Sequence, residues 1–162
     1  MVDNRQLSFV QRRAEALATV LLTSRDDLDV VGSADAPDVQ LMATIIRDNR
    51  RTGRQFGITV RGTVDPVDSL TSAERVLKAV TPRDWDDVGI YIPLCVFLFS
   101  MVEDRGYYAW RYEPSTVKGQ AKLLERVKLE CKKLDLAALD EIVARVNMFY
   151  DTLSATLISQ SP

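Results

Sequence analysis

The sequence contains no histidine and only two cysteines in its 162 residues. The lack of histidine excludes Ser-His-Asp and Cys-His nucleophile systems and every metal site with a histidine ligand. Acid–base chemistry would have to come from carboxylates, lysine, tyrosine or cysteine. Cys95 and Cys131 are far apart in the sequence and have no zinc-site spacing, so we expect two reduced, buried thiols.

Long hydrophobic runs are also lacking. The longest, residues 88–99, is shorter than the roughly 20 residues that cross a bilayer, and the first residues lack a signal-peptide core. The net charge of -2 is not the overall signature of a nucleic-acid-binding protein, although a local basic patch is compatible with one. The composition, 46% hydrophobic and 27% charged, is typical of folded soluble proteins. We therefore expect a cytoplasmic protein with no membrane partner.

Hydrophobic periodicity organises the first half of the chain. Apolar residues recur at helical spacing over residues 5–24. Alternation then predicts a three-stranded antiparallel meander over residues 27–64. Its strands are expected at 28–31, 39–48 and 55–64, with a polar hairpin loop at 49–54.

The second half begins with a predicted helix at residues 73–80. A strand buried on both faces follows, within residues 90–102, and its hairpin partner at 107–113 is expected to lie at the sheet edge. From Thr116 the composition favours helices, the last of them capped by Asp135. We expect residues 1–115 to form the core and residues 116–162 a C-terminal helical extension packed on the same domain.

One strand has an unusual polar face. Phe56, Ile58 and Val60 alternate with Thr59 and Arg61, so one side of this strand is apolar and the other presents a hydroxyl beside a guanidinium. Such a face is compatible with catalysis, with ligand binding, or with a solvated sheet surface.

Four segments in this order resemble a known family. They are "QRRAEALA" (11–18), "APDVQL" (36–41), "TVRGT" (59–63) and the strand pair within 91–114. The helix glutamate, the Pro-Asp that enters a strand and the alternating strand resemble the PD-(D/E)XK nuclease fold, and most closely its uncharacterised bacterial family called domain of unknown function 4365. The resemblance covers about residues 8–114. It implies an α/β, restriction-endonuclease-like core: helix, antiparallel three-strand meander, helix and a further strand pair, plus C-terminal helices.

The resemblance also implies a site. Glu15 matches the helix glutamate and Asp38 the metal-binding aspartate, while Thr59 stands where the family has an acid or glutamine, and Arg61 stands where it has lysine. Mg²⁺ prefers carboxylate ligands, and arginine stays protonated and cannot act as a base. We therefore expect a degenerate centre, no cofactor (Mg²⁺ if the protein is active), and Thr59 and Arg61 facing the Glu15 side of the first helix.

Two further groups of residues bear on binding. Arg61 and the loop arginines could neutralise phosphates in DNA, because guanidinium groups bind phosphate oxygens. These loop arginines are Arg47, Arg50, Arg51 and Arg54. Aromatic residues of the 107–113 strand could stack on bases, but they more often fill a core; they are Tyr107, Tyr108, Trp110 and Tyr112. The basic residues of the following segment are expected on a solvated helix face: Lys118, Lys122, Arg126, Lys128, Lys132 and Lys133.

Three hypotheses stay open at this point. The first is a catalytically degenerate nuclease-fold protein that binds nucleic acid or a protein partner. The second is an active Mg²⁺-dependent endonuclease in which Asp35 or Asp65 supplies the missing acid. The third is an interaction scaffold with no nucleic-acid role, forming a homodimer through its C-terminal helices. The apolar stripe available for that contact is Leu136, Leu139, Ile142, Val143, Val146, Phe149, Leu153 and Leu157.

Overall fold

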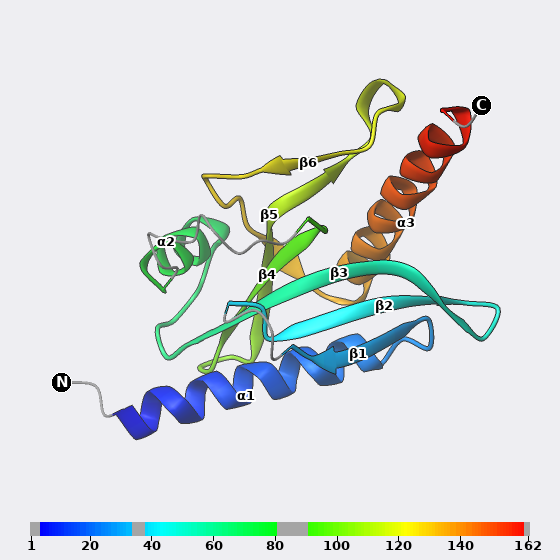
Figure 1. Ribbon diagram of the computed structural model, residues 1–162. Coiled ribbons are helices and arrows are strands. Elements are labelled where there is room, and N and C mark those ends of the chain that lie inside the picture. The colour runs from blue at the N-terminus through cyan, green and yellow to red at the C-terminus, as the bar shows by residue number, and fades with distance from the viewer. Residues whose placement is uncertain (1–3, 34–37, 81–90, 161–162) are drawn as a thin grey trace.

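The computed structural model describes residues 4–33, 38–80 and 91–160. These residues form an α/β fold with a mixed seven-stranded sheet and helices on both of its faces (Figure 1). The start of the predicted buried strand, residues 88–90, lies outside the described ranges. The elements in chain order are α1 (Asn4–Thr23), β1 (Leu28–Gly32), β2 (Leu41–Arg47), β3 (Arg50–Thr63), α2 (Leu70–Val80), β4 (Leu94–Ser100), β5 (Arg105–Ser115), the 3₁₀ turn η2 (Val117–Gly119), β6 (Lys122–Glu125), β7 (Lys132–Leu134) and α3 (Leu136–Ser159).

The sheet has the strand order β1-β2-β3-β4-β5-β6, and β7 pairs with β5 beside β6. Strands β3 and β4 are parallel, with α2 between them in the chain, and all other neighbours are antiparallel. The predicted meander is therefore confirmed, as is the antiparallel pair that follows the second helix. The long strand β3 lies near the centre of the sheet and joins its two halves.

The predicted hairpin loop at 49–54 is wrong. The turn consists of Asp48 and Asn49, both in the left-handed region with φ of 52° and 59°. Two such residues make the tight turn that fits the twist of antiparallel strands. Strand β3 consequently begins at Arg50, so Arg50, Arg51 and Arg54 belong to a strand, with a register shift opposite Ile45.

The molecule has three layers. One face of the sheet packs on α1 and α3, through a core cluster that includes Ala18, Ile58, Phe97 and Ile142. The other face is covered by α2, through a smaller cluster around Leu77 and Val96. Strand β4 is buried along its whole length, as expected for a strand covered on both faces.

Helix α1 lies very close to the sheet. Its buried positions Val10, Ala14 and Ala18 carry small or short side chains. A Cβ atom added at Gly62 of β3 would lie 2.8 Å from the Val10 carbonyl oxygen and 3.0 Å from Ala14 Cβ. Only glycine therefore allows this approach, and Gly62 sets the height of α1 above the strand.

Strand β5 is an internal strand rather than the predicted edge. Its far side pairs with β6 and β7, so Tyr107, Tyr108 and Trp110 are buried. Filling of the core by these three aromatic residues is confirmed, and they cannot stack on bases. Cys95 and Cys131 are free and buried, as expected, and burial raises the pKa of the Cys131 thiol to about 12.

The prediction of helix over residues 116–134 is also wrong. This segment forms η2, β6 and β7 and extends the sheet instead of adding a helical layer. Its lysines, leucines and glutamates favour helix locally, but β5 would otherwise expose an unpaired edge. The C-terminal extension therefore contributes two strands and a single described helix.

Helix α3 matches the sequence expectation closely. The Asp135 side chain accepts a hydrogen bond from the Ala138 amide, which is the predicted cap. Its buried residues end at Phe149, so the last ten residues of the helix carry no buried side chain. None of the helices in the described ranges is long and apolar enough to span a membrane.

A substitution at Gly62 tests the close approach of α1. Gly62→Ala should lower the free energy of unfolding by about 1–3 kcal/mol, because the added methyl group meets backbone that cannot move easily. Gly53→Ala on the same strand is the matched control, since a Cβ there meets nothing within 4 Å. Chemical denaturation of the two variants should separate them; equal stabilities would contradict the packing described for α1.

Candidate functional site

The candidate site lies where β2 and β3 part. The last paired residues of the two strands are Leu41 and Ile58, whereas β3 stays paired with β4 through Thr63. Beyond Ile58 the edge of β3 that faces β2 has no strand partner within residues 4–33, 38–80 and 91–160. Backbone groups buried near such a gap need hydrogen bonds from elsewhere, and here side chains supply them.

Two glutamines satisfy the backbone of Val60. The Val60 amide donates to Gln40 Oε1 at 2.7 Å, and Gln11 Nε2 of α1 donates to the Val60 carbonyl at 2.8 Å. Gln11 Nε2 also lies 3.0 Å from Glu15 Oε1, one turn further along α1. Helix α1 is thus tied to the open edge of β3 by a polar bridge.

Arg61 completes this arrangement. Its Nη1 donates to the Val60 carbonyl at 3.0 Å, and its Nη2 lies 3.6 Å from Asp38 Oδ1, an ion-pair distance. The Arg61 side chain is only 15% exposed. Burial lowers the pKa of the guanidinium, whereas the charges of Asp38 and Glu15 raise it. Arginine remains cationic under such shifts, so Arg61 places a fixed positive charge between two carboxylates.

Thr59 is used structurally. It is fully buried, and its hydroxyl donates to the Asp38 backbone carbonyl at 2.6 Å. This bond ties the segment that enters β2 to the middle of β3. The structure therefore brings Glu15, Asp38, Thr59 and Arg61 into one cluster, which we call the Arg61 cluster and which also contains Gln11 and Gln40.

The predicted orientation towards the Glu15 side of α1 is wrong for Thr59 and for the start of the Arg61 side chain, whereas the Arg61 guanidinium does reach that side. The α1 face of β3 is formed by Phe56, Ile58 and Val60, so the alternating residues Thr59 and Arg61 start on the opposite, α2-side face. Arg61 reaches Asp38 and the Val60 carbonyl because its long side chain curls around the open edge of β3. The expectation that Arg61 and Asp38 lie on the same side of the sheet is confirmed by their ion pair.

The donor set of the Arg61 cluster does not fit a divalent cation. Mg²⁺ needs several oxygen ligands, usually including carboxylates. Here the Asp38 carboxylate is paired with a guanidinium, and the Thr59 hydroxyl is engaged with a carbonyl. In the described ranges no three histidine, cysteine or acidic side chains come together as a metal-binding group.

Sequence reasoning missed Gln11 and Gln40 as members of this cluster. Both had a usable signal. Gln11 is four residues before Glu15 and thus on the same helix face, and Gln40 is two residues after Asp38 on an extended chain. The family resemblance implies only Glu15, Asp38, Thr59 and Arg61 as site residues, so it points to neither glutamine.

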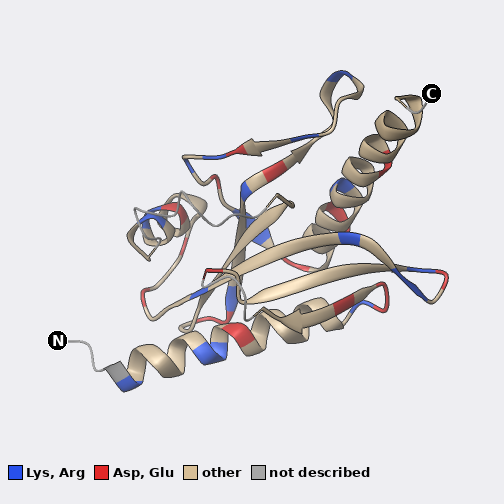
Figure 2. Cartoon of the chain, in the orientation of Figure 1, with Lys and Arg blue, Asp and Glu red and all other residues tan. Residues whose placement is uncertain are grey.

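The loop arginines do not form one surface with Arg61. Eleven residues of β3 separate Arg50 from Arg61, a distance of roughly 35 Å along a strand. Figure 2 shows the basic residues of the hairpin at the far end of the β2–β3 ribbon, beside acidic ones.

Three of the four arginines are also ion-paired. Arg51 Nε lies 3.0 Å from Asp29, and Arg47 lies 3.9 Å from Asp151. Arg54 is 17% exposed and holds α3 by hydrogen bonds from its guanidinium to Asn147 and Asp151. Arg54 is thus a structural contact, and only Arg50 keeps an exposed charge without an ion pair among the described residues.

The structure bears on one of the two alternative acids. Asp35 lies outside the described residues, so its role stays a prediction. Asp65 follows the end of β3, where its amide donates to Thr63 Oγ1 and its carbonyl accepts from Ser100. These contacts hold the chain after β3 and bring no second carboxylate to Asp38.

Comparison with protein-family models, with curated proteins and with solved structures finds no match for this chain. The resemblance to the PD-(D/E)XK nuclease fold therefore stays a prediction. The function has to be argued from the geometry of the Arg61 cluster and of the surfaces around it.

The Thr59 hydroxyl gives a direct test of this geometry. Thr59→Val should reduce the free energy of unfolding by about 1–2 kcal/mol, because a buried bond between two chain segments is lost. Thr19→Val is the matched control, since the Thr19 hydroxyl also donates to a carbonyl, but only within α1. Thermal or urea unfolding should show the difference; a neutral Thr59→Val would mean that the bond to Asp38 does not hold the cluster.

Proposed function

We propose that this protein has a nuclease-like core with an inactive centre and acts by binding another protein. The observation that carries the proposal is the position of Arg61. Its guanidinium lies against Asp38 and the Val60 carbonyl, at the one place where β2 and β3 part.

The inactive centre follows from the chemistry that nuclease activity requires. Hydrolysis of a phosphodiester in such a fold uses a divalent cation to polarise the phosphate and generate hydroxide from water. A divalent cation needs several negatively charged oxygen ligands, whereas the Arg61 cluster places a positively charged guanidinium at that position. Arg61 cannot serve as a base and Thr59 cannot replace a carboxylate. The element order and the clustering of Glu15, Asp38, Thr59 and Arg61 support the nuclease-like assignment, with the chemistry lost.

A protein partner fits the surfaces better than nucleic acid does. The arginines expected to contact phosphate are distant from Arg61, and three of them are paired with acidic residues. The chain as a whole is slightly acidic. By contrast, the projecting end of α3 presents apolar residues, including Ile158 at 74% exposure. Exposed apolar groups of this kind favour protein contacts.

A cleavage assay tests the inactive centre. Purified protein incubated with supercoiled plasmid and either Mg²⁺ or Mn²⁺ should leave the plasmid uncut, because the cluster lacks both the ligands and the base. Agarose electrophoresis of the plasmid forms is the measurement. Nicking that disappears in Asp38→Asn but persists in the distant variant Asp29→Asn would overturn the proposal.

Nucleic-acid binding is the second candidate, and one observation favours it. Residues 116–134 carry six Lys or Arg against two Glu, in a protein whose net charge is -2. All six are exposed along β6, β7 and their loops. Arg126 and Lys132 pair with Glu113 and Glu141, which leaves Lys118, Lys122, Lys128 and Lys133 as the candidate contacts. Lysines on a sheet edge also serve to prevent edge-to-edge pairing, so this surface has a second explanation.

A salt titration separates the two candidates. The proposed function predicts no retention of a short DNA duplex even at about 50 mM salt. Nucleic-acid binding instead predicts an affinity that falls with salt, with a log–log slope of about -0.9 for each phosphate neutralised. In that case, replacing the four lysines with alanine should flatten the slope. Arg50→Ala is the control for a charge elsewhere.

A further inference from the structure

The sheet ends at β6, and the outer edge of this strand is open. Strand β6 is the last in the strand order, and among the described residues it pairs with β5 alone (Figure 1). The Arg126 amide, just after β6, donates to the Arg111 carbonyl of β5. Backbone groups of an antiparallel strand point alternately to its two sides, so the amides and carbonyls of Leu123 and Glu125 point outward. This edge therefore offers hydrogen-bond donors and acceptors to an extended chain.

The same edge carries positive charge that the chain does not neutralise. Lys118 precedes β6, Lys122 begins it and Lys128 follows it, and all three side chains are exposed. None of these lysines forms an ion pair with the part of the chain that the structure describes. Of the two glutamates in this segment, Glu125 is paired with a buried arginine of β5, so only Glu130 opposes the lysines. The edge therefore attracts a negatively charged chain.

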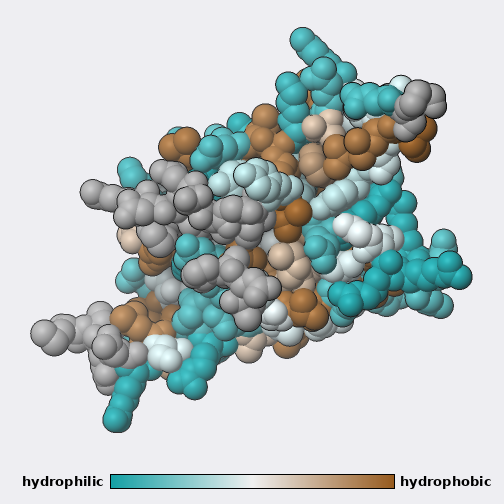
Figure 3. Space-filling view, viewed as in Figure 1, coloured by the Kyte–Doolittle hydropathy of each residue, from teal (hydrophilic) through white to brown (hydrophobic). Residues whose placement is uncertain are grey.

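Exposed apolar side chains accompany the lysines. Val117 is 71% exposed and Val127 is 93% exposed, each directly before an exposed lysine, and Leu124 of β6 is exposed as well. Figure 3 shows hydrophobic and hydrophilic residues interspersed on this part of the surface. Lysines alone on an edge strand prevent its pairing with other strands, but exposed apolar residues oppose that protection. The combination is that of an edge available for pairing with a suitable partner.

We propose that the outer edge of β6 pairs with an extended acidic segment of another protein, which adds one strand to the sheet. The backbone of Leu123 and Glu125 exchanges hydrogen bonds with that segment. Carboxylates along the segment meet Lys118, Lys122 and Lys128, and these contacts select an acidic chain among all extended ones. This inference rests on the proposed protein-binding role and names the chemistry of the partner.

Two other occupants fit this edge less well. A second copy that paired through the same edge would bring the lysines of both copies together, and like charges on adjacent strands destabilise their pairing. Nucleic acid would neutralise the lysines, but its phosphates cannot reproduce the alternating donors and acceptors of a strand or cover Val127. The opposite edge of the sheet, β1, has a different character, because its Asp29 is paired with Arg51.

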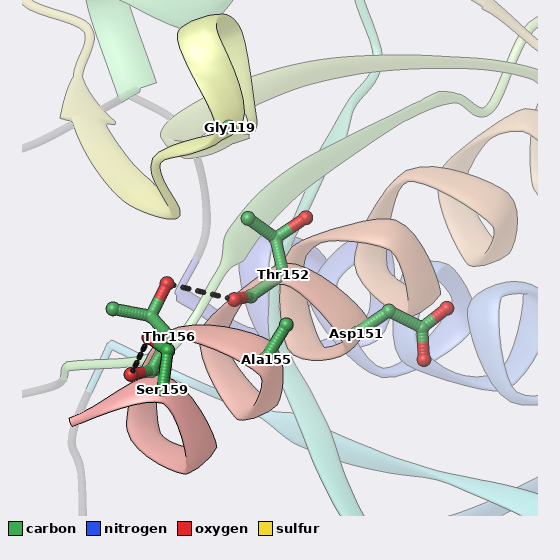
Figure 4. A pocket seen from close by; sticks show the side chains of 6 residues that line it. All are labelled: Gly119, Asp151, Thr152, Ala155, Thr156 and Ser159. Atoms are coloured by element: carbon green, nitrogen blue, oxygen red, sulfur yellow. Dashed lines mark hydrogen bonds between the residues drawn. The ribbon is translucent and has the colours of Figure 1, made fainter. Parts of the chain in front are cut away.

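The hollow beside the η2 turn does not suit an acidic chain. It encloses about 490 Å³ between Gly119 and the end of α3, and Asp151 is part of its lining. The hydroxyls of Thr156 and Ser159 donate to carbonyls of the same helix (Figure 4). An acidic segment would therefore meet a carboxylate and hydroxyls that are already bonded, whereas the outer edge of β6 presents lysines and backbone groups.

Binding of a synthetic peptide to the full chain is the first test. A labelled peptide of alternating glutamate and valine should bind with a Kd of about 100 µM, because one added strand makes a small interface. The matched peptide with lysine in place of glutamate should bind about tenfold more weakly or not at all. Lys122→Glu and Lys128→Glu should each weaken binding of the acidic peptide about fivefold. Arg50→Glu, on the β2–β3 hairpin, is the control variant. Fluorescence anisotropy at low salt is the measurement.

Strand pairing needs its own readout, because charge alone also attracts an acidic peptide. The peptide should slow hydrogen exchange of the Leu123 and Glu125 amides, whereas the Arg126 amide, already bonded to β5, should change little. Leu123→Pro should abolish binding and keep the fold, since proline at this position removes only an outward amide. Circular dichroism of the variant checks that it is folded.

Four results would overturn the inference. They are no binding at about 1 mM peptide, equal binding of the two peptides, unchanged exchange of the Leu123 and Glu125 amides in the complex, and displacement of the acidic peptide by a short DNA duplex. The last result would assign the lysines to nucleic acid. Plasmid cleavage would instead overturn the inactive centre and leave the strand pairing untouched, so the two failures are distinguishable.

Discussion

The structure depends on how the open edge of β3 is satisfied after β2 leaves it. Strand β3 joins the antiparallel meander to the β4–β5 half of the sheet, and among the described residues it is paired on one side only from Val60 onward. Gln40, Gln11 and Arg61 supply the missing hydrogen bonds. Unpaired backbone groups at such a position would destabilise the folded state. These three side chains are therefore engaged in hydrogen bonds to the backbone, which leaves them less able to take part in catalysis.

The hydrogen bonds of these side chains to β3 connect the fold with the proposed loss of activity. Gly62 lets α1 come close to β3 near the place where β2 and β3 part. At that place the polar side chains of this chain bond to one another and to the backbone. Arg61 is held by one carbonyl and one carboxylate, while the Thr59 hydroxyl is turned to the Asp38 backbone.

The sequence predicted those parts of the fold in which local pattern and tertiary need agree. The meander, the fully buried β4 and the Asp135 cap follow from alternation, continuous hydrophobicity and capping chemistry. The family resemblance predicted one cluster of four residues, and the structure places them together: Glu15, Asp38, Thr59 and Arg61. The prediction of helix over residues 116–134 was wrong because strand pairing with the open edge of β5 outweighs the helix propensity of this segment. The predicted side was wrong for Thr59, because alternation places it opposite Val60, whereas the long Arg61 side chain begins on that same face but its guanidinium reaches the Val60 carbonyl beside Gln11.

The most direct test of this account concerns the Arg61 cluster itself. NMR spectra of the wild-type protein titrated with Mn²⁺ report where the paramagnetic ion binds, because nearby amide signals broaden. If Arg61 occupies the place of a cation there, the amides of Asp38, Thr59 and Arg61 should broaden no more than those of exposed acidic control residues such as Asp26. Selective broadening around Asp38 at low Mn²⁺ concentration would show that a cation enters there and would contradict the account.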